Sequence, residues 1–314
     1  MAKKYKFDLT VDASALLQAN PSEYYSLLYG MENAVTNYRV LPGIKNKTKI
    51  ATVVFANVLA EAGCDFHAQD GTISAVEVDV CALTSQASVC QYDLEQSWLA
   101  LEMAKGSNSD FSVASFMNFF WGQMAKKAHQ ELAKLMWQGN SQSGDPLLAL
   151  CDGWLKRLCT TADYINGDVP QGGFNAGNVL EDGFAVALGL ATSEMLVNPA
   201  NMQFKVSPDV AAYYRIATAA NNTITNVTTG LALTYLDIAI VVEYGLPANT
   251  IILSDYTNFI YALDMEGDVD NLQIVDFSKT TLDRRIGARA DFKAGFYTVN
   301  DTQIVWVGGD AYCD

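Results

Sequence analysis

Residues 112–138 read SVASFMNFFWGQMAKKAHQELAKLMWQ, and this segment constrains the architecture more than any other. Its apolar residues recur at helical spacing and form one stripe, made of Val113, Phe116, Phe120, Met124, Ala128, Leu132 and Leu135. Ser109 or Asp110 can cap the start, and Gly139-Asn140 ends the pattern. At ~1.5 Å per residue the helix is about 40 Å long, which favours a spine over a short crossover.

The segment before this helix predicts a long β-hairpin. Residues 50–59 (IATVVFANVL) are rich in β-branched and aromatic residues, and residues 73–83 (ISAVEVDVCAL) alternate apolar and polar. A polar tip, residues 61–72, separates them. Strands of about ten residues exceed the usual five or six, and a lone ribbon is barely stable in water. We therefore expect the hairpin to lie on another surface.

The remaining chain predicts an α+β body with long protrusions. Residues 1–45 are expected to form an extended arm with one short helix at 24–31, because Asn20-Pro21-Ser22-Glu23 is a helix-start signal. Further helices are expected at 147–161, 176–192 and 208–220. Strands are expected at 238–244, 250–253, 272–276, 286–299 and 303–307. The sequence contains no low-complexity linker and no repeat of fixed period.

Composition suggests a protein with few charges to cover an isolated surface. Charged residues make up 18% of the 314, and apolar residues 50%. Either burial against neighbouring subunits or a large monomeric core produces this balance. The net charge is −15, which disfavours a general nucleic-acid-binding surface. Residues 1–49 carry seven bases and four acids, so a weakly basic arm precedes a strongly acidic body. The arm is either solvated or docked on a neighbouring subunit.

Cysteine usage and targeting signals favour a cytoplasmic protein with reduced thiols. The sequence has no run of ~18 apolar residues and no apolar segment after its N-terminal lysines. Its six cysteines lack CxxC pairs and zinc-type spacing. We expect them to be reduced and mostly buried as small hydrophobic residues.

Catalytic signatures are absent from the sequence. It contains no GxxxxGK loop, no GxGxxG after a strand and no GxSxG, and its two histidines, His67 and His129, are best explained as structural or solvated. An alternating acidic run, Asp264, Glu266, Asp268 and Asp270, has the oxygen density that calcium favours. Its glycine is misplaced for an EF-hand, so a solvated or inter-subunit acidic turn is the preferred interpretation. We expect no enzyme activity, no cofactor and no metal.

The order of these elements resembles the Hong Kong 97-like major capsid fold of tailed bacteriophages. CQYDLE at 90–95 resembles the segment leading into the spine helix in capsid proteins of phages of Bacteroides-like hosts. LDIAIVVEYGLPANTIILSDY at 236–256 resembles the family's strand, Pro-containing turn and strand. YALDMEGDVDNLQIVD at 261–276 and IGARADFKAGF at 286–296 resemble its closing strands.

The resemblance implies an α+β fold with four regions. These are an N-terminal arm (1–45), an extended hairpin or E-loop (46–83), a peripheral domain with the spine helix (84–144 and 276–314) and an axial domain (145–275). The chain starts directly with the arm, so scaffolding would be a separate protein or absent. Some relatives cross-link Lys to Asn, but no Asn partner or catalytic Glu is identifiable here.

The function that follows is a structural subunit of an icosahedral phage head around double-stranded DNA. Expected partners are other copies in pentamers and hexamers, with portal, scaffolding and decoration proteins, and the expected location is the virion. Candidate inter-subunit contacts are Lys3, Lys4, Lys6, Arg39, Lys45, Lys47, Lys49, His67, Asp264, Glu266, Asp268 and Asp270. The alternatives are an encapsulin-like compartment shell and an unrelated cytoplasmic α/β enzyme.

Overall fold

The structure is a computed structural model that describes residues 36–55, 71–90, 113–197, 199–220, 233–264, 272–277, 285–308 and 313. The chain separates into two compact units. Unit 1 comprises Met1–Glu32, Ala82–Leu132 and Glu266–Phe292, and unit 2 comprises Asn33–Cys81, Ala133–Met265 and Lys293–Asp314. Helix α6 and strand β12 contribute residues to both units.

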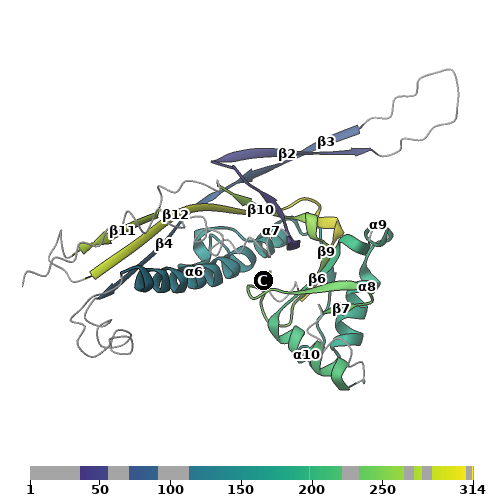
Figure 1. Cartoon of the computed structure of the whole chain (residues 1–314). Helices are drawn as coiled ribbons and strands as arrows, with labels where there is room; N and C mark the ends of the chain where they lie inside the picture. The colour runs from purple at the N-terminus through teal and green to yellow at the C-terminus, as the bar shows by residue number, and fades with distance from the viewer. Residues whose placement is uncertain are drawn as a thin grey trace, which may run out of the picture. The chain divides into compact units, whose positions relative to one another are not determined.

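Four strands precede the long helix α6 in the described chain, and seven strands follow α10 (Figure 1). The helical elements are α6 (Val113–Gln138), a 3-10 turn (Leu148–Leu150), α7 (Trp154–Thr161), a π-helix (Val179–Ala185), α8 (Val186–Leu190), α9 (Ser193–Leu196), 3-10 turns at Pro199–Asn201, Tyr256–Asn258 and Asp301–Gln303, and α10 (Pro208–Ala220). The strands are β1 (Arg39–Leu41), β2 (Lys47–Phe55), β3 (Gly71–Asp79), β4 (Cys81–Cys90), β5 (Ile165–Gly167), β6 (Met202–Val206), β7 (Thr234–Tyr235), β8 (Ile238–Val242), β9 (Ile251–Asp255), β10 (Phe259–Leu263), β11 (Leu272–Asp276), β12 (Arg285–Thr298) and β13 (Ile304–Val307).

Unit 1 is built around the first part of β12. Strand β11 runs antiparallel to it, with Leu272 opposite Ala290 and Asp276 opposite Ile286. Strand β4 also pairs with β12. The hydroxyl of Thr84 on β4 donates a 2.6 Å hydrogen bond to Asp291 on β12, which lowers the pKa of that carboxyl. The same unit contains the first part of α6.

Unit 2 contains a six-stranded mixed sheet in the order β5-β13-β9-β6-β8-β7. Its two edge strands have three and two residues, and such short edges limit unwanted pairing with other chains. Strand β6 lies between β8, to which it is parallel, and β9, to which it is antiparallel. Side chains from the π-helix, α8 and α10 complete one apolar core with this sheet.

The second sheet of unit 2 places β10 between β1 and the last part of β12. Strand β1 is parallel to β10, and β12 is antiparallel to it. All five residues of β10 are buried. An aromatic cluster stabilises this layer, with ring centroids 4.8–5.3 Å apart between Trp137 and Trp154 and from each of them to Phe259.

The predicted hairpin exists as a separate two-stranded ribbon (Figure 1). Nine residue pairs join β2 and β3, from Lys47 opposite Asp79 to Phe55 opposite Gly71. The expected second strand, 73–83, is corrected, because β3 ends at Asp79 and Cys81 begins β4, which pairs with β12. Apolar alternation continues across this change of partner, so the pattern alone could not detect it.

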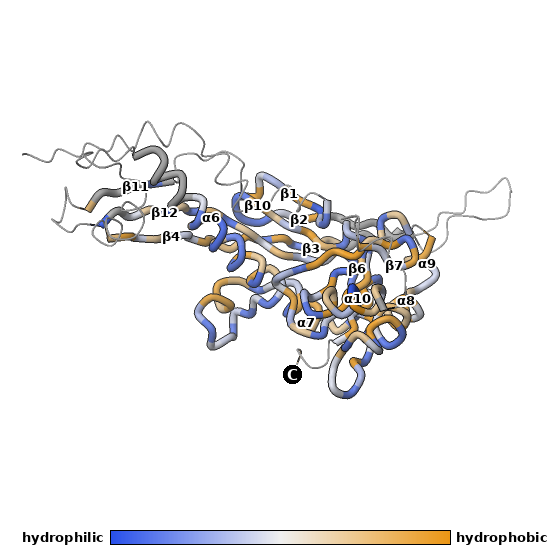
Figure 2. Tube along the Cα trace, turned by 60° about the horizontal axis from the view of Figure 1, so that its bottom comes forward, coloured by the Kyte–Doolittle hydropathy of each residue, from blue (hydrophilic) through white to orange (hydrophobic). Residues whose placement is uncertain are grey.

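The spine helix is confirmed over Val113–Gln138. Met124, Leu132 and Leu135 of the predicted stripe are buried, and in Figure 2 the tube of α6 carries both polar and apolar residues. The helix ends before Gly139, as expected. A Cβ at Gly139 would lie 2.2 Å from the carbonyl oxygen of Cys151, so only glycine fits where the chain returns past the helix end.

Two other predicted helices are corrected. The helix expected at 147–161 is a short 3-10 turn followed by α7, with an extended Cys151 between them. The break occurs because Gly153 N–H donates a 2.9 Å hydrogen bond to the Gly139 carbonyl, where the backbones are in close contact. The helix expected at 176–192 is a π-helix that continues as α8 to Leu190. The helix at 208–220 and the strands at 272–276, 286–299 and 303–307 are confirmed within one residue.

The division into arm, hairpin, peripheral and axial regions stays a prediction. Within residues 276–314, β12 joins the sheet of β10 and β11, whereas β13 joins the six-stranded sheet. This range therefore supplies strands to two sheets. The expected arm helix at 24–31 lies outside the described residues. Of the expected hairpin tip at 61–72, residues 61–70 also lie outside them, and residues 71–72 belong to strand β3 instead.

Candidate functional site: the roots of the two extensions

The hairpin is anchored in unit 2 at its open end. Val78 is fully buried in an apolar cluster with Ile44, Ile260, Ala262 and Tyr297. The Tyr297 hydroxyl accepts a 3.1 Å hydrogen bond from the Asp79 backbone N–H, and Val80 N–H donates to the Asn46 carbonyl. The last residue pairs of the ribbon are thereby held by the body of the same chain.

At the open end of the hairpin, here called the hairpin root, oppositely charged side chains pair with one another. Lys47 forms a 2.9 Å ion pair with Glu77, and the hydrogen bond from Lys47 lowers the pKa of the Glu77 carboxyl. Arg157 of α7 lies 3.9 Å from Asp79 and stacks over the Tyr297 ring at 3.7 Å. Exposed pairs such as Lys47–Glu77 contribute little stability, whereas the stacked Arg157 combines packing with charge.

The end of the arm is anchored on β6. Lys205 donates a 2.8 Å hydrogen bond to the Asn37 carbonyl, and the Gln203 amide donates to the Thr36 carbonyl at 3.3 Å. Tyr38 is buried, and its ring lies 4.8 Å from that of Trp154 and 4.4 Å from the Lys205 ammonium. Residues 36–41 are thus fixed to the body immediately before the hairpin begins.

Lys205 is a fully buried cation. Burial lowers its pKa to about 8, and the nearby Glu243 carboxylate partly opposes that shift. Burial also raises the pKa of Tyr38, with Glu243 adding to the effect. A buried charge needs hydrogen-bond partners, and here they are a backbone carbonyl of the arm and the Gln203 side chain at 3.3 Å.

Helix α7 connects these anchors. The Trp154 indole N–H lies within hydrogen-bond distance of two carbonyls, those of Tyr297 at 3.0 Å and Ile260 at 3.3 Å. Trp154 is fully buried, and its bonds join the two antiparallel strands β10 and β12. The same helix carries Arg157, so one short element supports both the hairpin root and the arm root.

The expectation of reduced cysteines is wrong in this structure. Cys81 is disulfide-bonded to Cys151, with their Cα atoms 6.0 Å apart, and Cys159 is bonded to Cys313, with theirs 5.4 Å apart. The expectation rested on the redox state of the cytoplasm and on the spacing of the cysteines. Spacing could not reveal these pairs, because the bonded cysteines lie 70 and 154 residues apart. Cys90 keeps a free thiol among the described residues, and Cys64 lies outside them.

The candidate contact residues fall into two groups. Arg39, Lys45, Lys47 and Lys49 are exposed around the arm and hairpin roots, and Asp264 forms a 3.0 Å ion pair with Lys293. The others lie outside the described residues, namely Lys3, Lys4, Lys6, His67, Glu266, Asp268 and Asp270. Contact of either group with another copy stays a prediction.

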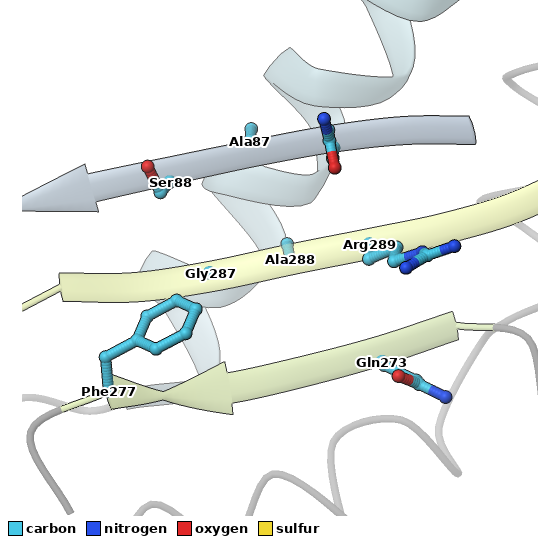
Figure 3. A pocket seen from close by; sticks show the side chains of 8 residues that line it. Ala87, Ser88, Gln273, Phe277, Gly287, Ala288 and Arg289 are labelled. Carbon is cyan, nitrogen blue, oxygen red and sulfur yellow. The ribbon is translucent and has the colours of Figure 1, made fainter. Parts of the chain in front are cut away.

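A shallow pocket of about 530 Å³ lies among the described residues of unit 1 (Figure 3). Strands β4, β12 and β11 line it, and Ser88 and Arg289 are among its polar residues. The Phe277 ring covers Gly287, where a Cβ would lie 2.5 Å from the ring. The lining contains no histidine, cysteine or carboxylate, so the Ser88 hydroxyl has no histidine or carboxylate base beside it in this pocket.

Within the described ranges no group of three metal-binding side chains occurs. In the part of the chain that the structure describes, none of the helices combines the length and hydropathy needed to cross a membrane.

Sequence reasoning missed the residues that anchor the extensions. Lys205 alternates with apolar residues in MQFKV, a pattern that normally places lysine in solvent. Trp154 and Tyr38 carry no local signal of their shared cluster. Only the apolar alternation over residues 73–83, which includes Val78, indicated that one face of the hairpin root is buried.

No protein-family model and no curated protein matches the chain. Solved structures do match it over most of its length. A chain of the satellite phage P4 procapsid, whose structure includes the size determination protein, gives a TM-score of 0.57 at 12% identity, covering 90% of this chain and 98% of that one. The capsid of a native GTA particle gives 0.56 at 13%, covering 90% of both chains. A Mycobacterium phage Che8 chain gives 0.51 at 14%, covering 91% of both.

These likenesses show the fold. The chain has the α+β, Hong Kong 97-like fold of phage capsid proteins, as the sequence predicted.

Proposed function

We propose that the chain is a structural subunit of an icosahedral phage head, without catalytic activity. The proposal includes assembly into pentamers and hexamers that enclose double-stranded DNA, with portal, scaffolding and decoration proteins as further partners. The capsid fold of its structural neighbours supports the shell role. A net charge of −15 suits a container that binds its DNA weakly.

The observation that carries the proposal is the β2–β3 ribbon. Its nine pairs extend from an anchored root, and neither strand pairs with a third strand among the described elements. Such a ribbon leaves both outer edges available for hydrogen bonds and is marginal by itself. Contact with a neighbouring copy would satisfy those groups and explain why the root is so firmly fixed.

Shortening the ribbon tests this proposal. Replacing residues 52–74 with Asn-Gly keeps the five pairs from Lys47–Asp79 to Ala51–Ala75 and closes them with a favoured hairpin turn. We expect the rest of the chain to fold with an unchanged melting temperature. The fraction of protein in assembled particles, measured by sedimentation velocity, should fall at least about tenfold. Assembly equal to that of the full chain would overturn the proposed role of the ribbon.

A second variant supplies the matched control. Replacing only residues 56–70 with Asn-Gly closes the loop in the same way but keeps all nine pairs. It should assemble better than the shorter variant, because more of the ribbon remains. Particles from a native source that contain a protein cargo instead of nuclease-protected DNA would contradict the DNA part of the proposal.

A further inference from the structure

Both disulfides end on the same short segment, residues 151–159. Cys151, immediately before α7, joins Cys81 at the hairpin root. Cys159, inside α7, joins Cys313, near the end of the chain. This short segment therefore holds two distant parts of the chain covalently.

The two bonds differ in their access to solvent. Cys151 is 3% exposed and its sulfur lies 4.0 Å from the buried carbonyl of Ala294, while its partner Cys81 is half-buried, so neither cysteine of this bond is exposed. Cys159 is half-buried, but its partner Cys313 is exposed, with the Tyr164 hydroxyl 3.6 Å from its sulfur. Thiol–disulfide exchange requires a thiolate to reach a sulfur atom, so access decides which bond reacts.

The two attachments also differ in what would remain after reduction. The hairpin root keeps the buried Val78, the hydrogen bond from Asp79 to Tyr297 and the contact of Arg157 with Asp79. The described contacts of Cys313 are the disulfide itself and the Tyr164 hydroxyl. Among the described contacts, breaking Cys159–Cys313 would therefore leave Cys313 with the Tyr164 hydroxyl alone, whereas breaking Cys81–Cys151 would leave the hairpin root packed.

We propose that Cys159–Cys313 is an exchangeable redox latch on the C-terminal segment, whereas Cys81–Cys151 is a permanent structural bond. This inference goes beyond the shell role and does not depend on it.

Exchange with a small thiol such as glutathione opens the latch in two steps. A glutathione thiolate attacks the Cys313 sulfur and displaces the Cys159 thiolate, which takes a proton from solvent. A second glutathione thiolate then displaces Cys313 from the mixed disulfide, so oxidised glutathione leaves and two cysteine thiols remain. Oxidised glutathione closes the latch by the reverse steps and releases two glutathione molecules.

Graded reduction of the full-length native protein tests the latch. Samples are treated with increasing glutathione, quenched with N-ethylmaleimide and analysed by peptide mass spectrometry. We expect Cys159 and Cys313 to be labelled at least about tenfold faster than Cys81 and Cys151. Oxidised glutathione should then restore the Cys159–Cys313 bond. The free thiol of Cys90 is the internal standard for labelling.

Digestion with a carboxypeptidase gives an independent measurement. The oxidised protein should resist trimming at Cys313, whereas the reduced protein and a C159S variant should be shortened toward β13. The C81S variant, which keeps the latch, should resist like the unmodified chain. Equal reduction rates for the two bonds, equal trimming of C159S and C81S, or thiol capping that finds no Cys159–Cys313 bond in oxidised protein would each overturn the proposal.

Discussion

Lys205 shows how a single side chain couples the arm to the body. It is buried beneath Tyr38, and its hydrogen bond reaches the backbone of Asn37, not a side chain. Any residue at position 37 would provide that carbonyl. The contact therefore fixes where the arm leaves the body without constraining the sequence there.

The buried Lys205 predicts a pH dependence of stability. Its pKa is about 8 in the folded chain and about 10.4 in an unfolded one, so between pH 8 and 10 the unfolded state binds more protons. The free energy of unfolding should therefore rise with pH in this window, by at most about 1.4 kcal/mol per pH unit. Urea unfolding at pH 7, 8, 9 and 10 measures this change in the free energy of unfolding.

The K205M variant is the control for this titration. It lacks the amine but retains Tyr38, whose own raised pKa affects both proteins alike. The stability of the unmodified chain relative to K205M should increase from pH 8 to 10. Parallel stability curves over that range would contradict the assignment.

At the scale of elements, the junction between α6 and α7 sets the positions of the anchors. Gly139 ends α6, and its carbonyl accepts the hydrogen bond from Gly153, which precedes Trp154. The close approach of these backbones directs the Trp154 indole toward β10 and β12. Cys151 lies in the same turn, so the first disulfide depends on this geometry.

A methyl group at Gly139 should disturb this junction. The Cβ of G139A would lie 2.2 Å from the Cys151 carbonyl oxygen and 2.6 Å from that of Leu135. We expect a loss of about 1–3 kcal/mol in the free energy of unfolding, measured by chemical denaturation. The G144A variant is matched, because nothing lies within 4 Å of its added carbon. If G139A proved as stable as G144A, the close approach would not constrain the fold.

Elements with a strong period were predictable from the sequence, and their partners were not. The stripe from Val113 to Leu135 located α6, β-branched and aromatic content located β2, and alternation located β3. Three features join residues that are distant in sequence. These are the change of strand partner at Val80, the position of β6 between β8 and β9, and the two disulfides. Of the anchoring site, the alternation over residues 73–83 indicated that the hairpin lies on another surface, but the sequence did not indicate the roles of Lys205 and Trp154.

At the scale of the whole molecule, the described extensions have firm roots in one unit. The arm ends on β6 and β10, and the hairpin begins a few residues later in the cluster around Val78. A rigid root fixes where an extension starts and in which direction it leaves the body, although the extension gains little stability from its own chain. This arrangement suits subunits that bind one another in a closed lattice.

Electron cryomicroscopy of particles formed by the full chain tests the central claim most directly. We expect closed shells in which the β2–β3 ribbon lies on an adjacent copy while its root remains packed around Val78. A ribbon folded back on its own chain, without contact to any other copy, would contradict the account.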